Sequence, residues 1–260
     1  MSRKLVAILA CRNGGSRLYA KPLQNLGSKK QITVIEYLIK SLKKFEIIED
    51  IGLAISEKKE NFIYKEIAKS NSLKFITGDD FDVLSRLIKC AKKLKATDVL
   101  RITTESPFPY LNNLKETWKK HLDNNYDATL LDNIIDGCGY EIIKLKALEK
   151  SHRNGQKKHK SELCTLYIRE NIHMFKINRV FPKKAYFRKD LRLTIDNPED
   201  LIVCKKIYEN FQRKKLNLEK IILYLDKNKK LKDLIAPYCD NGYSKMYKWV
   251  SRWGKIKTTS

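Results

Sequence analysis

The fold of this chain is decided by the segment Val6-Ala7-Ile8-Leu9-Ala10-Cys11-Arg12-Asn13-Gly14-Gly15-Ser16-Arg17-Leu18-Tyr19-Ala20-Lys21-Pro22-Leu23. Its first six residues form an uninterrupted apolar run, which predicts a strand buried on both faces of a sheet. The loop that follows holds two adjacent glycines and three cations, Arg12, Arg17 and Lys21. Free N–H groups together with Arg and Lys suit a polyphosphate. The segment therefore predicts either a phosphate-binding loop or an ordinary strand-to-helix turn with solvated cations.

Two familiar phosphate-binding signatures are missing from this loop. The sequence has no G-x-x-x-x-G-K-[ST] and no G-x-G-x-x-G, so neither a P-loop nor a dinucleotide fingerprint is present. A phosphate site here would have to be built in another way.

The loop at 12–23, R-N-G-G-S-R-L-Y-A-K-P-L, resembles the signature R-x-G-S-[ST]-R-L-P-G-K of the CMP-sugar synthetase (cytidylyltransferase) superfamily. It is most similar to the branch called spore-coat polysaccharide protein F, and relatives include CMP-sialic acid synthetase and CMP-Kdo synthetase. The three cations keep their mutual spacing. Gly15 replaces a usual Ser and Tyr19-Ala20 replace a usual Pro-Gly, which predicts a differently shaped turn before Lys21.

The composition indicates one large domain, or one domain with an appendage. Of the 260 residues, 42% are hydrophobic, which is enough for a real core. The six cysteines lie far apart, without a C-x-x-C or a Cys/His cluster, so zinc and a disulfide framework are not expected and a reducing cytoplasm is favoured. Residues 1–4 lead straight into the first strand without a signal peptide, and no apolar run is long enough for a transmembrane segment.

The net charge of +24 is the unusual feature of the composition. Such a charge is compatible with binding to nucleic acid or anionic lipid. A Lys-rich bias spread over the surface is the simpler interpretation, because Lys recurs everywhere and often beside Glu or Asp. No RNA-binding signature or zinc finger is present, so nucleic acid is not expected as a partner. An anionic small-molecule substrate would benefit from the field in either case.

Strand and helix alternate through the first hundred residues. After the first strand, strands are predicted at 51–55, 74–77 and 98–103, and helices at 32–45, 60–70 and 82–95. This alternation predicts a mostly parallel α/β sheet with right-handed crossovers and helices on both faces. Ligands bind such sheets at the carboxyl ends of strands. The Arg12–Lys21 loop and Thr103–Pro107 should therefore meet at that edge.

The second half of the chain continues this pattern less regularly. Helices are predicted at 111–124, 145–150 and 162–170, strands at 126–131, 137–143 and 191–195, an extended segment at 174–180, and an exposed basic loop at 152–160. Asn197 and Pro198 begin a further helix. We expect a Rossmann-like nucleotidyltransferase domain at 1–212, of the nucleotide-diphospho-sugar transferase type by resemblance, and a helical appendage with a basic tail at 213–260.

The resemblance extends from about residue 6 to residue 211 through further segments in the family's order. Gly78–Arg86 is similar to G-x-x-x-D-V-L-x-R, which lies against the nucleoside, and Arg101–Pro107 to R-[IVL]-T-x-D-x-P, whose acid binds magnesium. Gly137–Glu141 resembles the acceptor segment G-x-D-x-E, with Gly139 in place of its Asp. Residues 167–171 match Y-I-x-E-N, and residues 193–200 are similar to [WL]-T-[VI]-D-[TN]-P-E-D, whose first Asp is the second metal ligand.

The resemblance assigns a role to each matching position. It implies that Arg12, Arg17 and Lys21 are the catalytic cations on the triphosphate. The nucleotide would be bound by Ala10, Arg12, Asn13, Gly14, Lys21, Asp82, Arg86 and Thr103. Magnesium would be held by Glu105 and Asp196, and the acceptor by Tyr140, Glu141 and Arg169. Transfer to the α-phosphate builds negative charge on its oxygens, which positioned cations and Mg²⁺ stabilise.

Three of these assignments have a structural alternative. Glu105 stands where the family has Asp, so the metal could be left to Asp196 and water. Asp196 itself lies in the N-cap region of the next helix. Asp82 and Arg86 are one helical turn apart, so a simple i,i+4 ion pair is a competing explanation.

The resemblance implies a CTP-dependent cytidylyltransferase that joins CMP to an acidic sugar or a phosphorylated acceptor for surface-glycan synthesis. The preference for cytosine rests on the resemblance alone, because nothing in the composition or spacing selects the base. The first alternative is a glycosyltransferase of similar fold, which usually carries a D-x-D metal motif. The D-x-D of this chain, Asp80-Phe81-Asp82, is predicted to begin a helix instead of ending a core strand, which argues against that alternative. The second is a non-catalytic basic binding protein. A homodimer is also expected, because Gly137–Ile143 looks like part of the family's intersubunit arm, here about 137–187. Tyr140, Ile142 and Ile143 would then bury apolar surface between subunits.

The tail at 243–257 interleaves aromatic residues with lysines and arginines. That composition suits a peripheral membrane contact or an anionic partner. Tyr247, Val250 and Trp253 recur at helical spacing, however, which favours docking of the tail on the protein's own core.

Deleting residues 243–260 distinguishes the two uses of the tail. Self-docking predicts that the deletion lowers the thermal unfolding temperature and exposes apolar surface to a hydrophobic dye, because a packed face is removed. Membrane docking predicts unchanged stability and lost binding to anionic vesicles. A truncated chain as stable as the full one would rule out self-docking.

Overall fold

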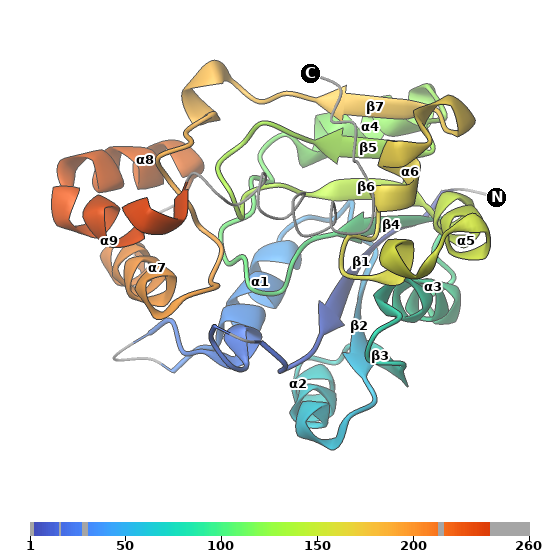
Figure 1. Cartoon of the computed structure of the whole chain (residues 1–260), viewed down its shortest axis with the longest axis horizontal. Coiled ribbons are helices and arrows are strands. Elements are labelled where there is room, and N and C mark those ends of the chain that lie inside the picture. Colours follow the sequence, from blue (N-terminus) through green and yellow to red (C-terminus); the bar gives the residue numbers. More distant parts are fainter. Residues whose placement is uncertain (1–2, 16, 28–30, 213–215, 240–260) are drawn as a thin grey trace.

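The computed structural model describes residues 3–15, 17–27, 31–212 and 216–239, and the predicted tail at 243–257 lies outside them. These residues form a seven-stranded sheet in the order β3-β2-β1-β4-β6-β5-β7 (Figure 1). The strands are β1 (Leu5–Cys11), β2 (Asp50–Ser56), β3 (Lys74–Gly78), β4 (Asp98–Arg101), β5 (Ala128–Leu131), β6 (Glu141–Lys144) and β7 (Ile177–Val180). Only β6 runs antiparallel to its neighbours within this sheet. The predicted mostly parallel α/β sheet is confirmed.

Strand β1 is an interior strand of the sheet, third in the order, and it is buried as its apolar run predicts. It pairs in parallel with β2 on one side and with β4 on the other. All of its side chains are fully buried except that of Ala10, near the carboxyl end. The loop after β1 therefore starts at the centre of the carboxyl edge.

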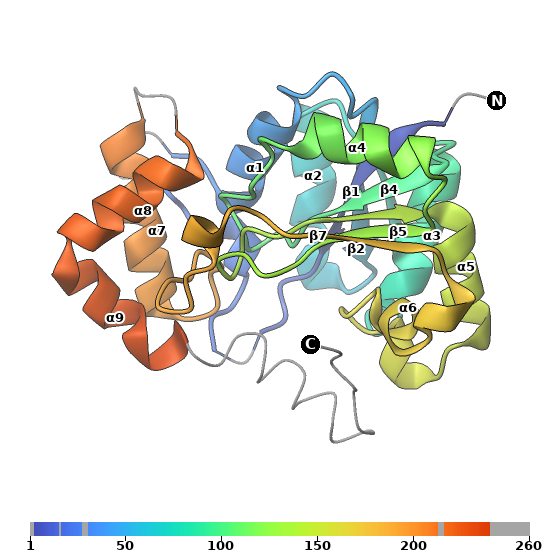
Figure 2. The same cartoon turned by 90° about the horizontal axis from the view of Figure 1, so that it is seen from above.

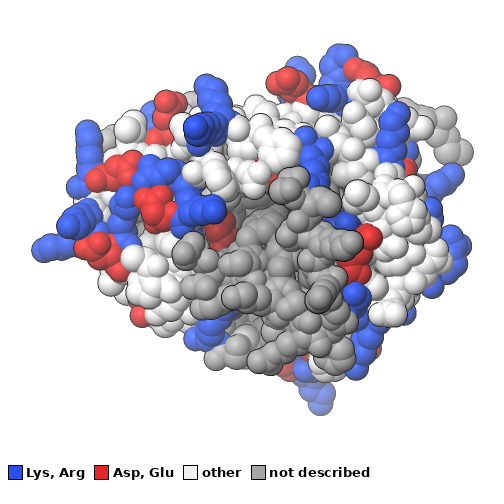
Figure 3. Space-filling view, turned by 45° about the horizontal axis from the view of Figure 1, so that its top comes forward, with Lys and Arg blue, Asp and Glu red and all other residues white. Residues whose placement is uncertain are grey.

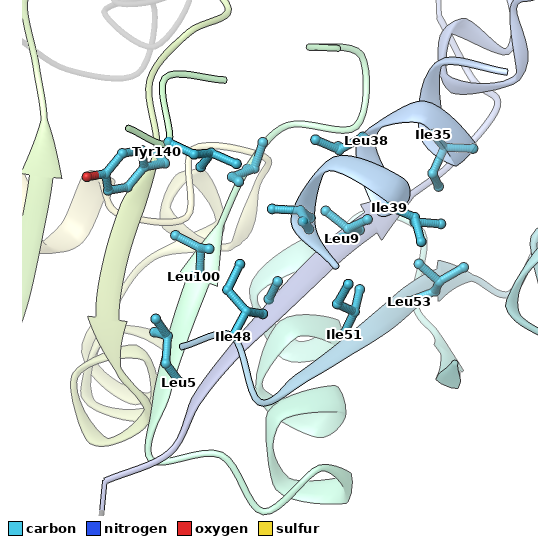
Figure 4. Close-up of a cluster of buried hydrophobic side chains, with 14 of the residues drawn as sticks. Leu5, Leu9, Ile35, Leu38, Ile39, Ile48, Ile51, Leu53, Leu100 and Tyr140 are labelled. Atoms are coloured by element: carbon cyan, nitrogen blue, oxygen red, sulfur yellow. The ribbon is translucent and has the colours of Figure 1, made fainter. Parts of the chain in front are cut away.

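Helices cover both faces of the sheet (Figure 2). One face carries α1 (Val34–Leu42), α2 (Ile63–Ser70) and α4 (Leu114–Asp123), and the other carries α3 (Val83–Lys93), α5 (Leu145–Asn154) and α6 (Leu166–Glu170). Figure 4 shows Ile35, Leu38 and Ile39 of α1 packed over Leu9 and Leu53 of the sheet. Each such fully buried aliphatic side chain contributes about 1.5–3 kcal/mol of transfer free energy.

The C-terminal helices form a third layer against one end of the sheet (Figure 1). They are α7 (Pro198–Phe211), α8 (Leu218–Lys227) and α9 (Lys229–Cys239), and their apolar faces meet in a separate buried cluster. The chain also contains short 3₁₀ turns at Lys21–Leu23, Lys59–Asn61, Lys157–Lys160, Ile172–Met174 and Lys184–Tyr186. The predicted helical appendage is confirmed over its described residues.

Two predicted elements differ in the structure. Residues 191–195 are buried but form no strand, because their hydrogen bonds are divided between two segments: Leu193 N–H donates to Asp136 O and Ile195 N–H to Glu105 O. The predicted exposed loop at 152–160 is instead the end of α5 and a 3₁₀ turn. His159 is buried there, with Nε2 2.7 Å from a Glu170 carboxylate oxygen.

The intersubunit role predicted for 137–143 is not supported. Tyr140, Ile142 and Ile143 are buried inside this chain, where β6 pairs with β4 and β5. Their apolar surface is therefore used by the sheet itself. The homodimer remains a prediction, but these three residues no longer support it.

The surface shows how the high charge is distributed. On the face drawn in Figure 3, basic side chains are scattered and acidic ones stand among them, most densely over α8 and α9. One such group joins Arg188 to Asp190 and Asp226, and Lys232 to the same two carboxylates. All six cysteines are free thiols. No helix among the described residues has the length and apolar character needed to cross a bilayer.

Gly137 joins two segments of the chain that approach the carboxyl edge of the sheet. It has φ of 87°, a left-handed conformation that side chains disfavour. A Cβ atom there would lie 2.5 Å from the carbonyl carbon of Leu193. Position 137 therefore requires glycine, because the backbone there passes directly against the backbone of Leu193 and Thr194. This close approach also lets Asp136 pair with Arg192.

We expect Gly137→Ala to lower the free energy of unfolding by more than about 2 kcal/mol, since backbone strain adds to a clash with backbone atoms. Urea denaturation measures this change. Gly14→Ala is the matched control, because its Cβ would meet nothing within 4 Å. Equal stabilities for the two variants would contradict the assigned role of Gly137.

Candidate active site

A pocket opens where β1 and β4 end, at the edge predicted to bind a ligand. It is lined by Ala10, Arg12, Gly14, Lys21, Pro22, Val83, Arg86, Arg101, Ile102, Thr103, Thr104, Glu105 and Glu162. Seven of the predicted site residues are among them: Ala10, Arg12, Gly14, Lys21, Arg86, Thr103 and Glu105. The predicted meeting of the first loop with residues 103–105 is thus confirmed.

The loop after β1 is held in shape by its own backbone and by the residues before α2. Ala20 N–H donates to Asn13 O over 2.9 Å, and Asn61 accepts from Asn13 N–H over 2.7 Å. Ala20 has φ of 50°, the left-handed conformation that the family's usual glycine adopts easily. A Cβ on Gly15 would lie 2.6 Å from Leu18 O. The glycine at position 15 therefore has a local explanation in this turn, whereas Ala20 adopts a conformation that favours glycine.

Asp196 forms ion pairs with cations from two parts of the chain. Its Oδ1 accepts from Lys21 Nζ over 2.5 Å and lies 3.3 Å from Arg17 Nη2. Its Oδ2 accepts from Arg192 Nη2 over 2.5 Å. Burial acts to raise the pKa of Asp196, but Lys21, Arg192 and Arg17 outweigh it and hold that pKa below its usual value. Asp196 is thus ionised and close to the pocket cation Lys21.

Glu105 lies close to Asp196 because their two backbone segments are hydrogen-bonded to each other. Ile195 N–H donates to the Glu105 carbonyl over 3.0 Å. Burial, and then the negative charge of Asp196, raise the pKa of the Glu105 carboxyl above its usual value. Two carboxylates brought together in this way favour an added cation, which would stabilise both.

Arg86 is the most unusual side chain of the pocket. It projects from the first turn of α3 and is only 1% exposed, and its Nε and Nη1 atoms have no hydrogen-bond partner among the residues that the structure describes. Burial lowers its pKa, and the nearby Arg12 acts in the same direction. An i,i+4 ion pair with Asp82 is not formed, because Asp82 caps α3 through Ser85 N–H and lies 2.7 Å from His152 Nε2. The guanidinium therefore offers donors to an anion in the pocket.

Arg12 and Arg101 are both held by the segment before α6. Arg12 Nη2 donates to the Glu162 carboxylate over 2.7 Å, and Arg101 Nη2 donates to the Glu162 carbonyl over 2.6 Å. Arg101 also donates to Glu141 over 2.9 Å. Arg101, Thr104 and Glu162 line the pocket but are not among the predicted site residues. Arg101 and Thr104 lie inside the quoted Arg101–Pro107 motif, whereas no sequence signal marks Glu162.

Several predicted residues lie outside the pocket lining. The Asn13 side chain is buried and donates to the Glu60 carbonyl. Asp80 of the D-x-D sequence accepts from Ser56 and Lys58, and Asp82 caps α3, so neither belongs to the lining. The two carboxylates of the D-x-D sequence are thus used for structural hydrogen bonds and ion pairs, and not for a metal site of the glycosyltransferase type.

The three predicted acceptor residues do not share one surface. The Tyr140 hydroxyl donates to Asn113 over 2.9 Å within the core on the α4 side. Arg169 pairs with Asp132 and with Glu141, at 3.0 and 3.1 Å. Glu141 and Arg169 therefore join a charged network that reaches the pocket through Arg101, whereas Tyr140 is a core residue.

Comparison with known proteins agrees with this geometry. The profile of a family described as cytidylyltransferase matches residues 6–235. An uncharacterized protein of Methanocaldococcus jannaschii, MJ1063, is 31% identical over 231 residues, covering 89% of this chain and 94% of its own. The spore coat polysaccharide biosynthesis protein SpsF of Bacillus subtilis is 24% identical over 235 residues, covering 86% and 95%. A cytidylyltransferase structure from Leptospira borgpetersenii superposes with a TM-score of 0.80 at 22% identity, covering 88% and 97%.

Replacing Arg86 tests whether its buried guanidinium serves a ligand. We expect Arg86→Met to gain about 1–3 kcal/mol of stability, because unpartnered buried donors are removed. CTP should then no longer raise the thermal unfolding temperature. The exposed Lys89→Met on the same helix is the control and should change neither value. An Arg86→Met protein that is destabilised and still stabilised by CTP would contradict this role.

Proposed function

The chain belongs to the cytidylyltransferase family, and from this premise we propose that it transfers CMP from CTP to an acidic sugar or a phosphorylated acceptor and releases pyrophosphate. The observation that carries the proposal is the convergence of three cations on one pocket beside two carboxylates. Arg12 and Lys21 come from the loop after β1, and the unpartnered Arg86 from α3. Glu105 lines the same pocket and Asp196 is bonded to Lys21.

In this proposal the cations bind the triphosphate and stabilise the charge that develops during transfer. Lys21 Nζ and Arg17 would move from Asp196 to phosphate oxygens, and Arg12 from Glu162. Those present pairs have N···O distances of 2.5, 3.3 and 2.7 Å. Arg86 gives up no partner for its Nε and Nη1 donors when an anion binds. Its two donors therefore gain the most from the nucleotide.

We propose Glu105 and Asp196 as the residues that would hold Mg²⁺. Two protein carboxylates, with phosphate oxygens and water filling the shell, suit this ion. The pKa of Glu105 is raised first by burial and then by the negative charge of Asp196, and a bound cation would offset both effects. When bound, the metal would supply Lewis-acid stabilisation of phosphate oxygens.

The acceptor is proposed from the family and from the relative SpsF, whose name refers to spore coat polysaccharide biosynthesis. An acidic sugar or sugar phosphate would be attracted by the positive field of the chain. Glu141 and Arg169 would act on the acceptor through Arg101, with which Glu141 forms an ion pair. Tyr140 is no longer proposed as an acceptor residue, because it belongs to the core. We further propose a cytoplasmic site of action, where free thiols persist.

The experiment that tests this function is a pyrophosphate-release assay. Each of the four nucleoside triphosphates is tested against a panel of acidic sugars and sugar phosphates, with magnesium present or chelated. CTP-dependent release that requires both acceptor and magnesium is expected. Salt-dependent retention on heparin without any turnover would instead favour the basic binding protein.

Lys21→Ala should lower turnover by on the order of a hundredfold, because a charge-assisted contact at the reacting phosphate is lost. The fold should persist, since among the described residues the Lys21 ammonium forms an ion pair with Asp196 alone. The exposed Lys40→Ala on α1 is the control and should retain full turnover. Near-normal rates for Lys21→Ala would reject the assignment of this loop.

A further inference from the structure

Arg192 lies at the centre of an acidic cluster next to the candidate pocket. Its side chain is 3% exposed, and it does not line the pocket. Nε donates to Asp200 and Nη1 to Asp136, each over 2.9 Å, and Nη2 donates to Asp196 Oδ2 over 2.5 Å. Nη1 also donates to the Tyr238 carbonyl of α9 over 3.3 Å.

Asp200 holds the backbone of the same turn. Its Oδ2 accepts from the N–H groups of Asp196 and Asn197, over 3.0 and 2.9 Å. Asp196 is thus fixed twice, by Arg192 at its side chain and by Asp200 at its backbone. Its other carboxylate oxygen, Oδ1, is left facing Lys21 and the pocket.

We propose that Arg192 is a positioning residue that orients the Asp196 carboxylate for Mg·CTP. This inference rests on the proposed function, in which Asp196 holds magnesium. A planar guanidinium can bond three aspartates in fixed directions, whereas a lysine ammonium is a single point charge on a flexible stem. Groups that orient a metal ligand typically change metal affinity 10–100-fold when altered.

The contact with Tyr238 extends this role to the appendage. Through it, the end of α9 is joined to Arg192, and Arg192 to Asp196. The C-terminal helices therefore brace the site, although the pocket lining includes none of their residues. This gives the appendage a function in the geometry of the proposed reaction.

The test uses Arg192→Lys, which keeps the positive charge but removes the planar guanidinium and its several fixed donors. Calorimetric titration with CTP at fixed magnesium should show a dissociation constant raised by about tenfold. The magnesium needed for half-maximal turnover should rise similarly, with the acceptor KM unchanged. Arg188→Lys is the matched control, because Arg188 bonds two other aspartates, Asp190 and Asp226, and should leave both values unchanged.

A double-mutant cycle separates positioning from general structural support. In an Asp196→Asn background, Arg192→Lys should change the dissociation constant by less than about twofold, since its target carboxylate is gone. An equal loss in both backgrounds, or no loss in a folded Arg192→Lys protein, overturns the inference. If Arg192→Lys unfolds, Asp200→Asn takes its place with the same expected results. A native chain that neither binds Mg·CTP nor releases pyrophosphate overturns the proposed function itself, and the inference with it.

Discussion

The ion pairs of Asp196 are the interaction on which the candidate site depends. Asp196 joins the loop after β1, through Lys21, to the segment before α7, through Arg192. These segments are about 175 residues apart in the chain, and each lies at the carboxyl edge of the sheet. In a partly buried setting such charge-assisted bonds are strong, and losing one partner leaves the others uncompensated. The carboxylate therefore links the loop after β1 to the segment that leads into the C-terminal helices.

The site also contains groups whose burial is not compensated. Arg86 is a buried cation with unpartnered donors, and Glu105 is a buried carboxyl next to another negative charge. Both arrangements lower the stability of the ligand-free chain, because desolvation is not repaid by partners. A bound magnesium nucleotide would satisfy both at once. Perturbed groups of opposite sign in one pocket are characteristic of functional sites.

The C-terminal helices connect the packing of the chain to its candidate site. Its helices bury apolar faces against α7, which accounts for their presence as a layer. The same packing places the Tyr238 carbonyl on Arg192, so the layer also constrains the site. Gly137 contributes from the other side, because only a residue without a Cβ lets the chain pass so close to Leu193.

The sequence alone determined the alternating strands and helices, the buried first strand, and the edge of the sheet at which the pocket opens. It could do so because hydrophobic periodicity and glycine-rich turns are local signals. The resemblance supplied most of the pocket residues, and Arg101 and Thr104 were inside a recognised motif without being assigned. Only the tertiary structure decided the rest: that 191–195 forms no strand, that Tyr140 belongs to the core, and that Glu162 and Arg192 complete the charge pairs. Those outcomes depend on partners far away in sequence, and no local pattern specifies which distant carboxylate a buried cation will meet.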